Sequence, residues 1–151
     1  MKIEMGTLKS SPFVGVFSVV TDKIALFPQV LEAKEKKQVE KLFGLETIYT
    51  SLANSSLIGV VAIGNSHGFA VSEIVEQEEI DALEESGIRI KKVSGITALG
   101  NMVECNDEKA FCSKAVPKKT IKEIEKALKV ECIEAKVAES DLIGSNIVLT
   151  N

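Results

Sequence analysis

The sequence predicts a mixed α/β fold in which strands and helices combine in repeated ββαβ units. The first observation is a short apolar motif, centred on a glycine, that returns along the chain of 151 residues. Successive glycines are 44, 41 and 44 residues apart, and they are Gly15, Gly59, Gly100 and Gly144. The second observation is that a polar turn, an apolar run, a helical pattern and another apolar run follow each of the first three motifs. Such a period is typical of one supersecondary unit used several times.

The motif around each glycine predicts the first strand of its unit. These strands cover residues 13–21, 57–65 and 98–106, and a fourth begins at residues 142–146. Strands this apolar are typical of positions covered on both faces. A glycine inside the strand permits the close approach of neighbouring backbone that a packed central axis requires.

A β-hairpin is expected next in each unit, because Asn, Asp and Gly in the turn tolerate left-handed backbone conformations. The turns occupy residues 21–23, 65–68 and 106–109, and the second strands occupy residues 24–27, 69–71 and 110–112.

An amphipathic helix and a last strand complete each predicted unit. The third helix is clearest, since Ile121, Ile124 and Leu128 fall at helical spacing behind Pro117. A capping box is expected there from Thr120 to Glu123. The remaining expected elements are helices at residues 32–43 and 76–86, which stop at Gly44 and Gly87, and last strands at residues 45–50, 88–93 and 130–137.

We expect one incomplete domain over residues 1–151, because a unit of about 43 residues cannot bury its sheet and its helix alone. The units must therefore pack around a shared core. The expected repeats are residues 12–55, 56–96, 97–140 and a partial copy at 141–151.

Composition and charge describe an ordinary globular protein. The chain is 45 % hydrophobic and 26 % charged, with a net charge of -4 and a pI near 5.2. It therefore lacks the basic footprint of a nucleic-acid-binding protein. Its longest apolar runs fall well short of the roughly 20 residues of a membrane-spanning helix, and residues 1–11 do not resemble a signal peptide. A cytoplasmic protein with no membrane partner is expected.

Cysteine usage predicts neither a disulfide framework nor a metal site. Cys105, Cys112 and Cys132 make an odd number, and their spacing around the single His67 matches no zinc pattern. No metal and no cofactor are expected.

Several matched motifs resemble the translation initiation factor 6 family of archaea and eukaryotes over nearly the whole chain. They are Leu57-Ile58-Gly59 continuing to Gly64-Asn65-Ser66-His67-Gly68, then Thr97-Ala98-Leu99-Gly100-Asn101 continuing to Cys105-Asn106-Asp107, and finally Leu142-Ile143-Gly144-Ser145. The resemblance implies the pentein fold, a β/α-propeller of five ββαβ units. It also implies a protein that is not an enzyme, that binds the large ribosomal subunit, that sterically prevents its association with the small subunit, and that takes part in large-subunit biogenesis.

The chain departs from that family pattern in length. About three and a quarter of five units are present, and roughly 70 further residues would complete the ring. We expect a monomer if the chain is complete and an oligomer if it is truncated, because unpaired strand edges invite pairing with another chain.

Polar residues at the turns and beside one glycine are the predicted ribosome-binding residues. Equivalent turns of a propeller point the same way, so Thr21 and its counterparts would share one face. The resemblance adds the residue after the third glycine. The predicted residues are Asn65, His67, Asn101, Asn106 and Asp107. Simpler roles as turn formers or internally bonded amides remain open for them.

Charge runs and the fold suggest the remaining hypotheses. Residues 73–85 contain seven acids and no base, whereas residues 109–129 contain seven lysines and two glutamates. The acidic run fits a basic ribosomal protein, so protein contacts are expected to dominate binding. The alternatives are a pentein hydrolase or amidinotransferase acting through a Cys and His67, and a shortened oligomeric paralogue without ribosome binding. No small-molecule substrate is expected.

Overall fold

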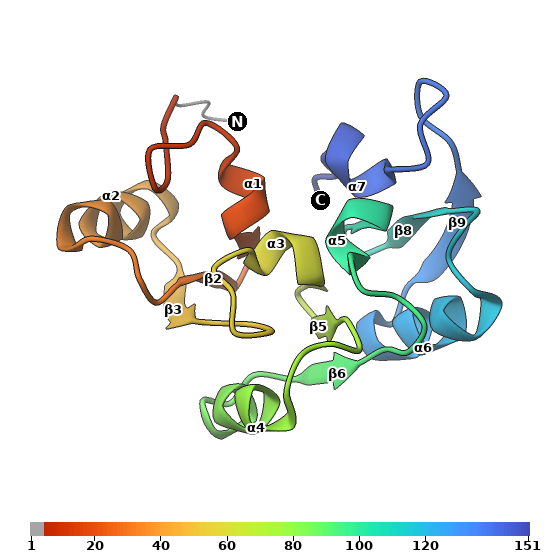
Figure 1. Ribbon diagram of the computed structural model, residues 1–151, viewed down its shortest axis with the longest axis horizontal. Helices are drawn as coiled ribbons and strands as arrows, with labels where there is room; N and C mark the ends of the chain where they lie inside the picture. The colour runs from red at the N-terminus through yellow and green to blue at the C-terminus, as the bar shows by residue number, and fades with distance from the viewer. Residues whose placement is uncertain (1–4) are drawn as a thin grey trace.

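One series of elements occurs three times in the computed structural model, which describes residues 5–151 (Figure 1). Residues 1–4, which begin the segment examined for a signal peptide, lie outside this range. Each series is a one-turn helix, an antiparallel strand pair, a longer helix and a strand that returns parallel to the second. A mixed α/β architecture is thus confirmed.

The first copy contains α1 (Val14–Phe17), β1 (Val19–Val20), β2 (Ile24–Pro28), α2 (Ala33–Phe43) and β3 (Glu46–Thr50). The second contains α3 (Ile58–Val61), β4 (Ala62–Asn65), β5 (Gly68–Val71), α4 (Gln77–Glu85) and β6 (Ile90–Lys92). The third contains α5 (Leu99–Met102), β7 (Val103–Cys105), β8 (Lys109–Ser113), α6 (Lys118–Leu128) and β9 (Glu131–Ala135), and α7 (Ile143–Asn146) follows.

The predicted first strands are wrong in their first half. Each repeat glycine lies in a one-turn helix, and the strand begins only afterwards, for example at Ala62 after α3 and at Val103 after α5. After α7, residues 147–151 form no strand. A short apolar run has no period that separates a buried helical turn from a buried strand, so the motif alone could not decide between them.

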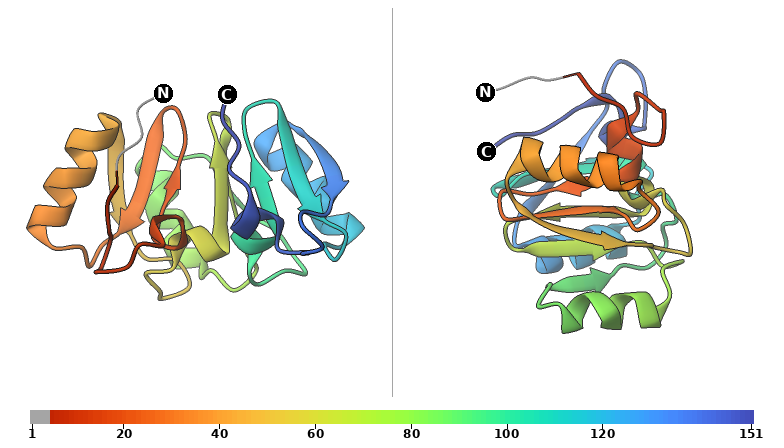
Figure 2. Two further views of the ribbon diagram at one scale, coloured as in Figure 1. Left: turned by 90° about the horizontal axis from the view of Figure 1, so that it is seen from above. Right: turned by 90° about the vertical axis from the view of Figure 1, so that its left-hand side faces the viewer.

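The glycines bring the one-turn helices into direct backbone contact around a common axis. A Cβ atom on Gly59 would lie 1.8 Å from the Gly15 carbonyl oxygen, one on Gly100 would lie 1.9 Å from that of Gly59, and one on Gly144 would lie 2.0 Å from that of Gly100. Figure 2 shows the one-turn helices together at one end of this axis and the hairpin turns at the other. We call these the short-helix end and the turn end.

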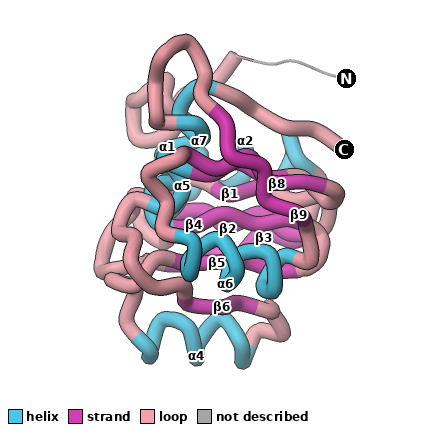
Figure 3. Tube along the Cα trace, turned by 90° about the vertical axis from the view of Figure 1, so that its right-hand side faces the viewer, coloured by secondary structure: helices cyan, strands magenta, loops and turns pink. Residues whose placement is uncertain are grey.

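Neighbouring copies share their cores, as the size of the unit predicts. Helix α6 contacts β5 of the preceding copy as well as β9 of its own (Figure 3). Accordingly Ile63 and Ala70 of the second copy are buried in one cluster with Ile124 and Leu128 of α6. Leu26 of β2 is likewise buried in the core beneath α4. A single copy would leave these apolar surfaces in water.

Carboxylates on the long helices α2 and α4 hold the turns that precede the one-turn helices α1 and α3. Glu35 of α2 accepts a hydrogen bond of 2.7 Å from the backbone N–H of Lys9. Glu79 of α4 accepts bonds of 2.7 and 3.0 Å from the N–H groups of Ala53 and Asn54. Lys9, Ala53 and Asn54 have positive φ, so these bonds secure backbone conformations that L-residues seldom adopt.

The predicted capping box from Thr120 to Glu123 is wrong, because Pro117 occupies the N-cap and α6 begins at Lys118. Thr120 is fully buried and its hydroxyl donates to the carbonyl of Ser94. Glu123 accepts a 2.7 Å bond from the backbone N–H of Ser94. Both side chains therefore join α6 to the preceding loop. Among residues 5–151 no helix is long and apolar enough to cross a membrane.

Replacement of Gly100 tests the axial contact. We expect Gly100→Ala to lower the free energy of unfolding by at least about 3 kcal/mol, because its Cβ would overlap backbone atoms of α3. Gly15→Ala is the matched control, since a Cβ on Gly15 meets no described atom within 4 Å and alanine favours the helix. Urea unfolding measures both. Equal stability of the two variants would contradict the role of the contact.

Candidate functional site

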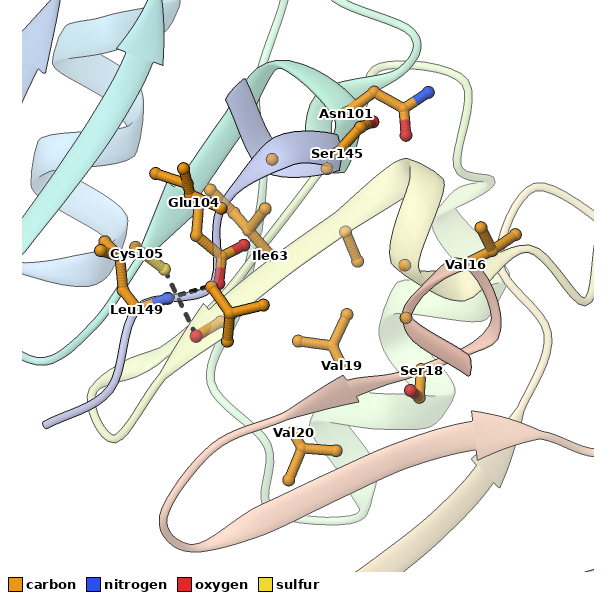
Figure 4. A pocket seen from close by; sticks show the side chains of 18 of the residues that line it. Val16, Ser18, Val19, Val20, Ile63, Asn101, Glu104, Cys105, Ser145 and Leu149 are labelled. Carbon is orange, nitrogen blue, oxygen red and sulfur yellow. Dashed lines mark hydrogen bonds between the residues drawn. The ribbon is translucent and has the colours of Figure 1, made fainter. Parts of the chain in front are cut away.

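A half-open cavity of about 710 Å³ lies at the axis between the four glycine segments (Figure 4). Its walls are mostly apolar and include Val19, Val20, Ile63 and Leu149. Residues of all four glycine segments line it, among them Gly15, Gly59, Gly100 and Gly144 themselves. The cavity is therefore built on the same axis around which the copies are arranged.

Glu104 is the charged side chain that lines this cavity. Counted from the repeat glycine, its counterparts in the other copies are Val19, Ile63 and Val148. The half-buried carboxylate accepts one long hydrogen bond of 3.4 Å, from the backbone N–H of Leu149 (Figure 4). Burial raises the pKa of Glu104 to about 7, which this single bond only partly offsets.

At the turn end, Asn65 serves as an internal connector and is not displayed on the surface. It is 4 % exposed, and its amide nitrogen donates to the carbonyls of Asn106 at 3.1 Å and Leu128 at 3.0 Å. Its amide oxygen accepts from the backbone N–H of His67 at 2.9 Å. Asn65 thus closes its own turn and joins it to the third copy, while the side chain of His67 is exposed.

Asn106 and Asp107 repeat this arrangement one copy later. Asn106 donates to the carbonyl of Thr150 at 3.0 Å, and Asp107 accepts from the backbone N–H of Ser66 at 2.7 Å. Burial alone would raise the pKa of Asp107, but the bond from Ser66 and the nearby charges of His67 and Lys23 lower it below its usual value. These two side chains also order the turn end.

Asn101 lies apart from the other four predicted residues. It belongs to α5 at the short-helix end, while the hairpin turns occupy the opposite end of the axis (Figure 2). The side chain is partly exposed and forms no hydrogen bond with residues 5–151. The structure therefore brings Asn65, His67, Asn106 and Asp107 together and leaves Asn101 on another surface.

Sequence reasoning missed three exposed apolar side chains at the short-helix end. Phe13, Leu57 and Leu142 precede α1, α3 and α7, and they are 71 %, 40 % and 46 % exposed. Each stands two residues before a repeat glycine, so the shared offset could have identified them. Repeated exposed apolar residues are typical of an interaction surface. We call Phe13, Leu57, Asn101 and Leu142 the docking face.

Cys105 does not resemble a catalytic nucleophile. Cys105 lines the cavity and donates to the carbonyl of Gly64. Burial and the adjacent Glu104 raise the pKa of its thiol, whereas an activated nucleophile needs a lowered one. His67, the expected partner, lies in an exposed turn. Residues 5–151 also contain no group of three or more His, Cys, Asp or Glu side chains placed to hold a metal ion.

Comparison with known proteins gives the family. A sequence model described as the eIF-6 family matches residues 3–151. The chain belongs to the eIF-6 family. Similar eIF-6 family proteins, each named Translation initiation factor 6, are those of Methanocaldococcus jannaschii, at 33 % identity over 93 % of the chain, and Pyrococcus horikoshii, at 34 % over 100 %.

This eIF-6 family chain spans 64 % of the length of the first relative and 70 % of the second. Agmatine deiminase of C. jejuni has a similar structure, with a TM-score of 0.55 at 15 % identity over 80 % of the chain and 49 % of the deiminase. At this identity the likeness shows the fold alone, which is the pentein fold expected from the resemblance.

The buried carboxyl makes the stability of this eIF-6 family chain depend on pH. Because the pKa of Glu104 rises from an ordinary 4.5 to about 7 on folding, the folded state holds the proton more tightly. Its contribution to stability is complete below about pH 4.5 and is lost as the pH rises through 7.

We therefore expect the free energy of unfolding of the natural chain, relative to Glu104→Gln, to fall by about 3 kcal/mol between about pH 4.5 and pH 8. Urea unfolding of both proteins across this range measures the difference. A difference that stays constant with pH would contradict the raised pKa.

Proposed function

We propose that this chain acts as a translation initiation factor 6-like protein that binds the large ribosomal subunit and prevents its association with the small subunit. The observation that carries the proposal is the match to the eIF-6 family over residues 3–151, with relatives named Translation initiation factor 6. The mechanism is steric and requires no cofactor. A rigid body bound to the joining surface leaves no room for the second subunit, and the same occupancy supports a role in large-subunit biogenesis.

The docking face is the surface that binds in this proposal. Phe13, Leu57 and Leu142 present apolar area that water disfavours, and burying it on a partner is favourable. Asn101 adds an amide that is free to bond a partner's backbone. Apolar groups around a polar one suit a protein surface better than a phosphate backbone, which demands clustered Lys and Arg. A ribosomal protein is therefore the proposed contact.

The turn end has a supporting role in the proposal. Asn65, Asn106 and Asp107 form hydrogen bonds with neighbouring copies, so they maintain the arrangement of copies that presents the docking face. His67 retains a free side chain but has no apolar surroundings comparable to Phe13. A ribosome contact at this end would add to the principal one at the short-helix end.

Co-sedimentation with large ribosomal subunits tests the proposal. We expect the natural chain to co-migrate with large subunits and to block joining of small subunits. Phe13→Asp and Asn101→Ala should each weaken binding by about tenfold, because they remove an apolar contact and an amide from the docking face. Phe13 is exposed and Asn101 is partly exposed, so both variants should fold. Circular dichroism of each variant checks this.

His67→Ala is the matched control at the turn end and should bind as the natural chain does. Loss of binding in His67→Ala together with normal binding of Phe13→Asp would show that the ribosome contact lies at the turn end instead of the docking face. A folded natural chain that remains at the top of the gradient would overturn the proposed function.

A further inference from the structure

We infer that the axial cavity binds a small aliphatic amine in its protonated form, with Glu104 as the counter-charge. This inference goes beyond the proposed function, because it depends on Glu104, which is not part of the docking face, although Phe13 and Asn101 of that face also line the cavity. It rests on the shape of the cavity, on the charges around it and on the departure of Glu104 from the repeat.

Glu104 breaks a rule that the other copies follow. The equivalent residues of the other copies are all apolar, namely Val19, Ile63 and Val148. The repeat therefore favours an apolar side chain at this position. A carboxylate placed there loses hydration and recovers only the 3.4 Å bond from Leu149. Among the described residues no lysine or arginine forms an ion pair with Glu104. The charge of Glu104 therefore does not stabilise the fold. A ligand of opposite charge would compensate the lost hydration.

The cavity has the size and walls of a small-molecule site. Its volume of about 710 Å³ falls within the range of known ligand pockets, roughly 300 to 1,000 Å³. Val19, Val20, Ile63 and Leu149 provide apolar walls near the single carboxylate (Figure 4). Uncharged polar side chains also line the cavity, namely Ser18, Asn101, Ser145 and Asn146. This combination favours a ligand with a hydrocarbon body and one charged end.

The turn end adds further carboxylates near the cavity. A second hollow of about 280 Å³ adjoins the cavity through Gly64 and Cys105 and adds Asp22 and Asp107 to its lining. The charges of Lys23 and His67 act on Asp107, so the negative charge beside the cavity comes mainly from Glu104 and Asp22. The titratable groups that line the two hollows are Glu104, Cys105, Asp22 and Asp107.

An organic cation fits better than a metal ion. Hard metal ions require several oxygen ligands to replace their water shell, whereas the wall around Glu104 is hydrocarbon. A primary ammonium group needs one carboxylate and a few carbonyls, and its alkyl chain gains from the apolar wall. Since burial raises the pKa of Glu104 to about 7, amine binding should weaken below pH 7, as the carboxylate becomes protonated.

The experiment compares n-butylamine with 1-butanol by NMR titration of the full chain at pH 8. The two probes have nearly the same shape, so their difference reports the charge. We expect saturable, millimolar binding of n-butylamine, and affinity for 1-butanol at least about tenfold lower. Glu104→Gln should reduce n-butylamine affinity by about tenfold and leave 1-butanol unaffected. Glu108→Gln, the same charge change at an exposed neighbouring site outside the cavity, should leave both affinities unchanged.

Equal affinity for the amine and the alcohol, or full n-butylamine affinity in Glu104→Gln, would overturn the inference. An equal loss of n-butylamine affinity in Glu108→Gln would show that binding depends only on the overall negative charge of the protein. That result would also overturn the inference. The lysine derivative Nα-acetyl-lysine methylamide separates a free amine from a lysine side chain. Preference for this derivative over n-butylamine by about tenfold would assign the cavity to a partner's lysine instead.

Discussion

The contact between a glycine Cα and the carbonyl oxygen of the preceding repeat glycine is the constraint on which the rest of the structure depends. No side chain fits where a Cβ would lie 1.8 to 2.0 Å from that oxygen. The contact repeats at Gly59, Gly100 and Gly144, so it fixes the step from one copy to the next. The two ends of the axis follow, because each strand must leave its one-turn helix in the same direction (Figure 2).

Polar groups then hold the copies together at positions where the cores cannot. Apolar packing is shared between α6 and β5, but it does not by itself define which loop meets which helix. Glu79 and Glu123 supply that specificity by accepting backbone N–H bonds from the loops ahead of them. At the turn end Asn65 and Asn106 connect the copies in the opposite sense, because their amide nitrogens donate to backbone carbonyls of the next copy. The amides are conserved in position from one copy to the next because they bond equivalent carbonyls.

The sequence predicts the long helices, the second strands and the last strands within a few residues, because turn residues and helical spacing are local signals. It fails where a tertiary contact decides. The motif around Gly59 looks like a strand, yet the axial contact requires a helical turn. Asn65 looks like an exposed turn residue, yet two carbonyls from distant segments bury it. Phe13 and Leu142 share an offset from the repeat glycines that marks them as equivalent, but their apolar character alone does not distinguish exposed from buried positions.

Positions where the copies have the same residue type give information about the fold, and positions where one copy differs give information about function. The glycines recur in all four segments and the connecting asparagines in the second and third copies, where they join one copy to the next, so they indicate the fold and not the partner. Asn101 and Glu104 are departures within one copy, three residues apart: Val16 and Val60 stand where Asn101 does, and Val19 and Ile63 stand where Glu104 does. Neither change improves packing, since an unbonded amide and a half-buried carboxylate both cost free energy. Both side chains line the axial cavity, and Asn101 also belongs to the docking face. The third copy is thus the one in which polar side chains replace apolar ones at two positions of the same short segment.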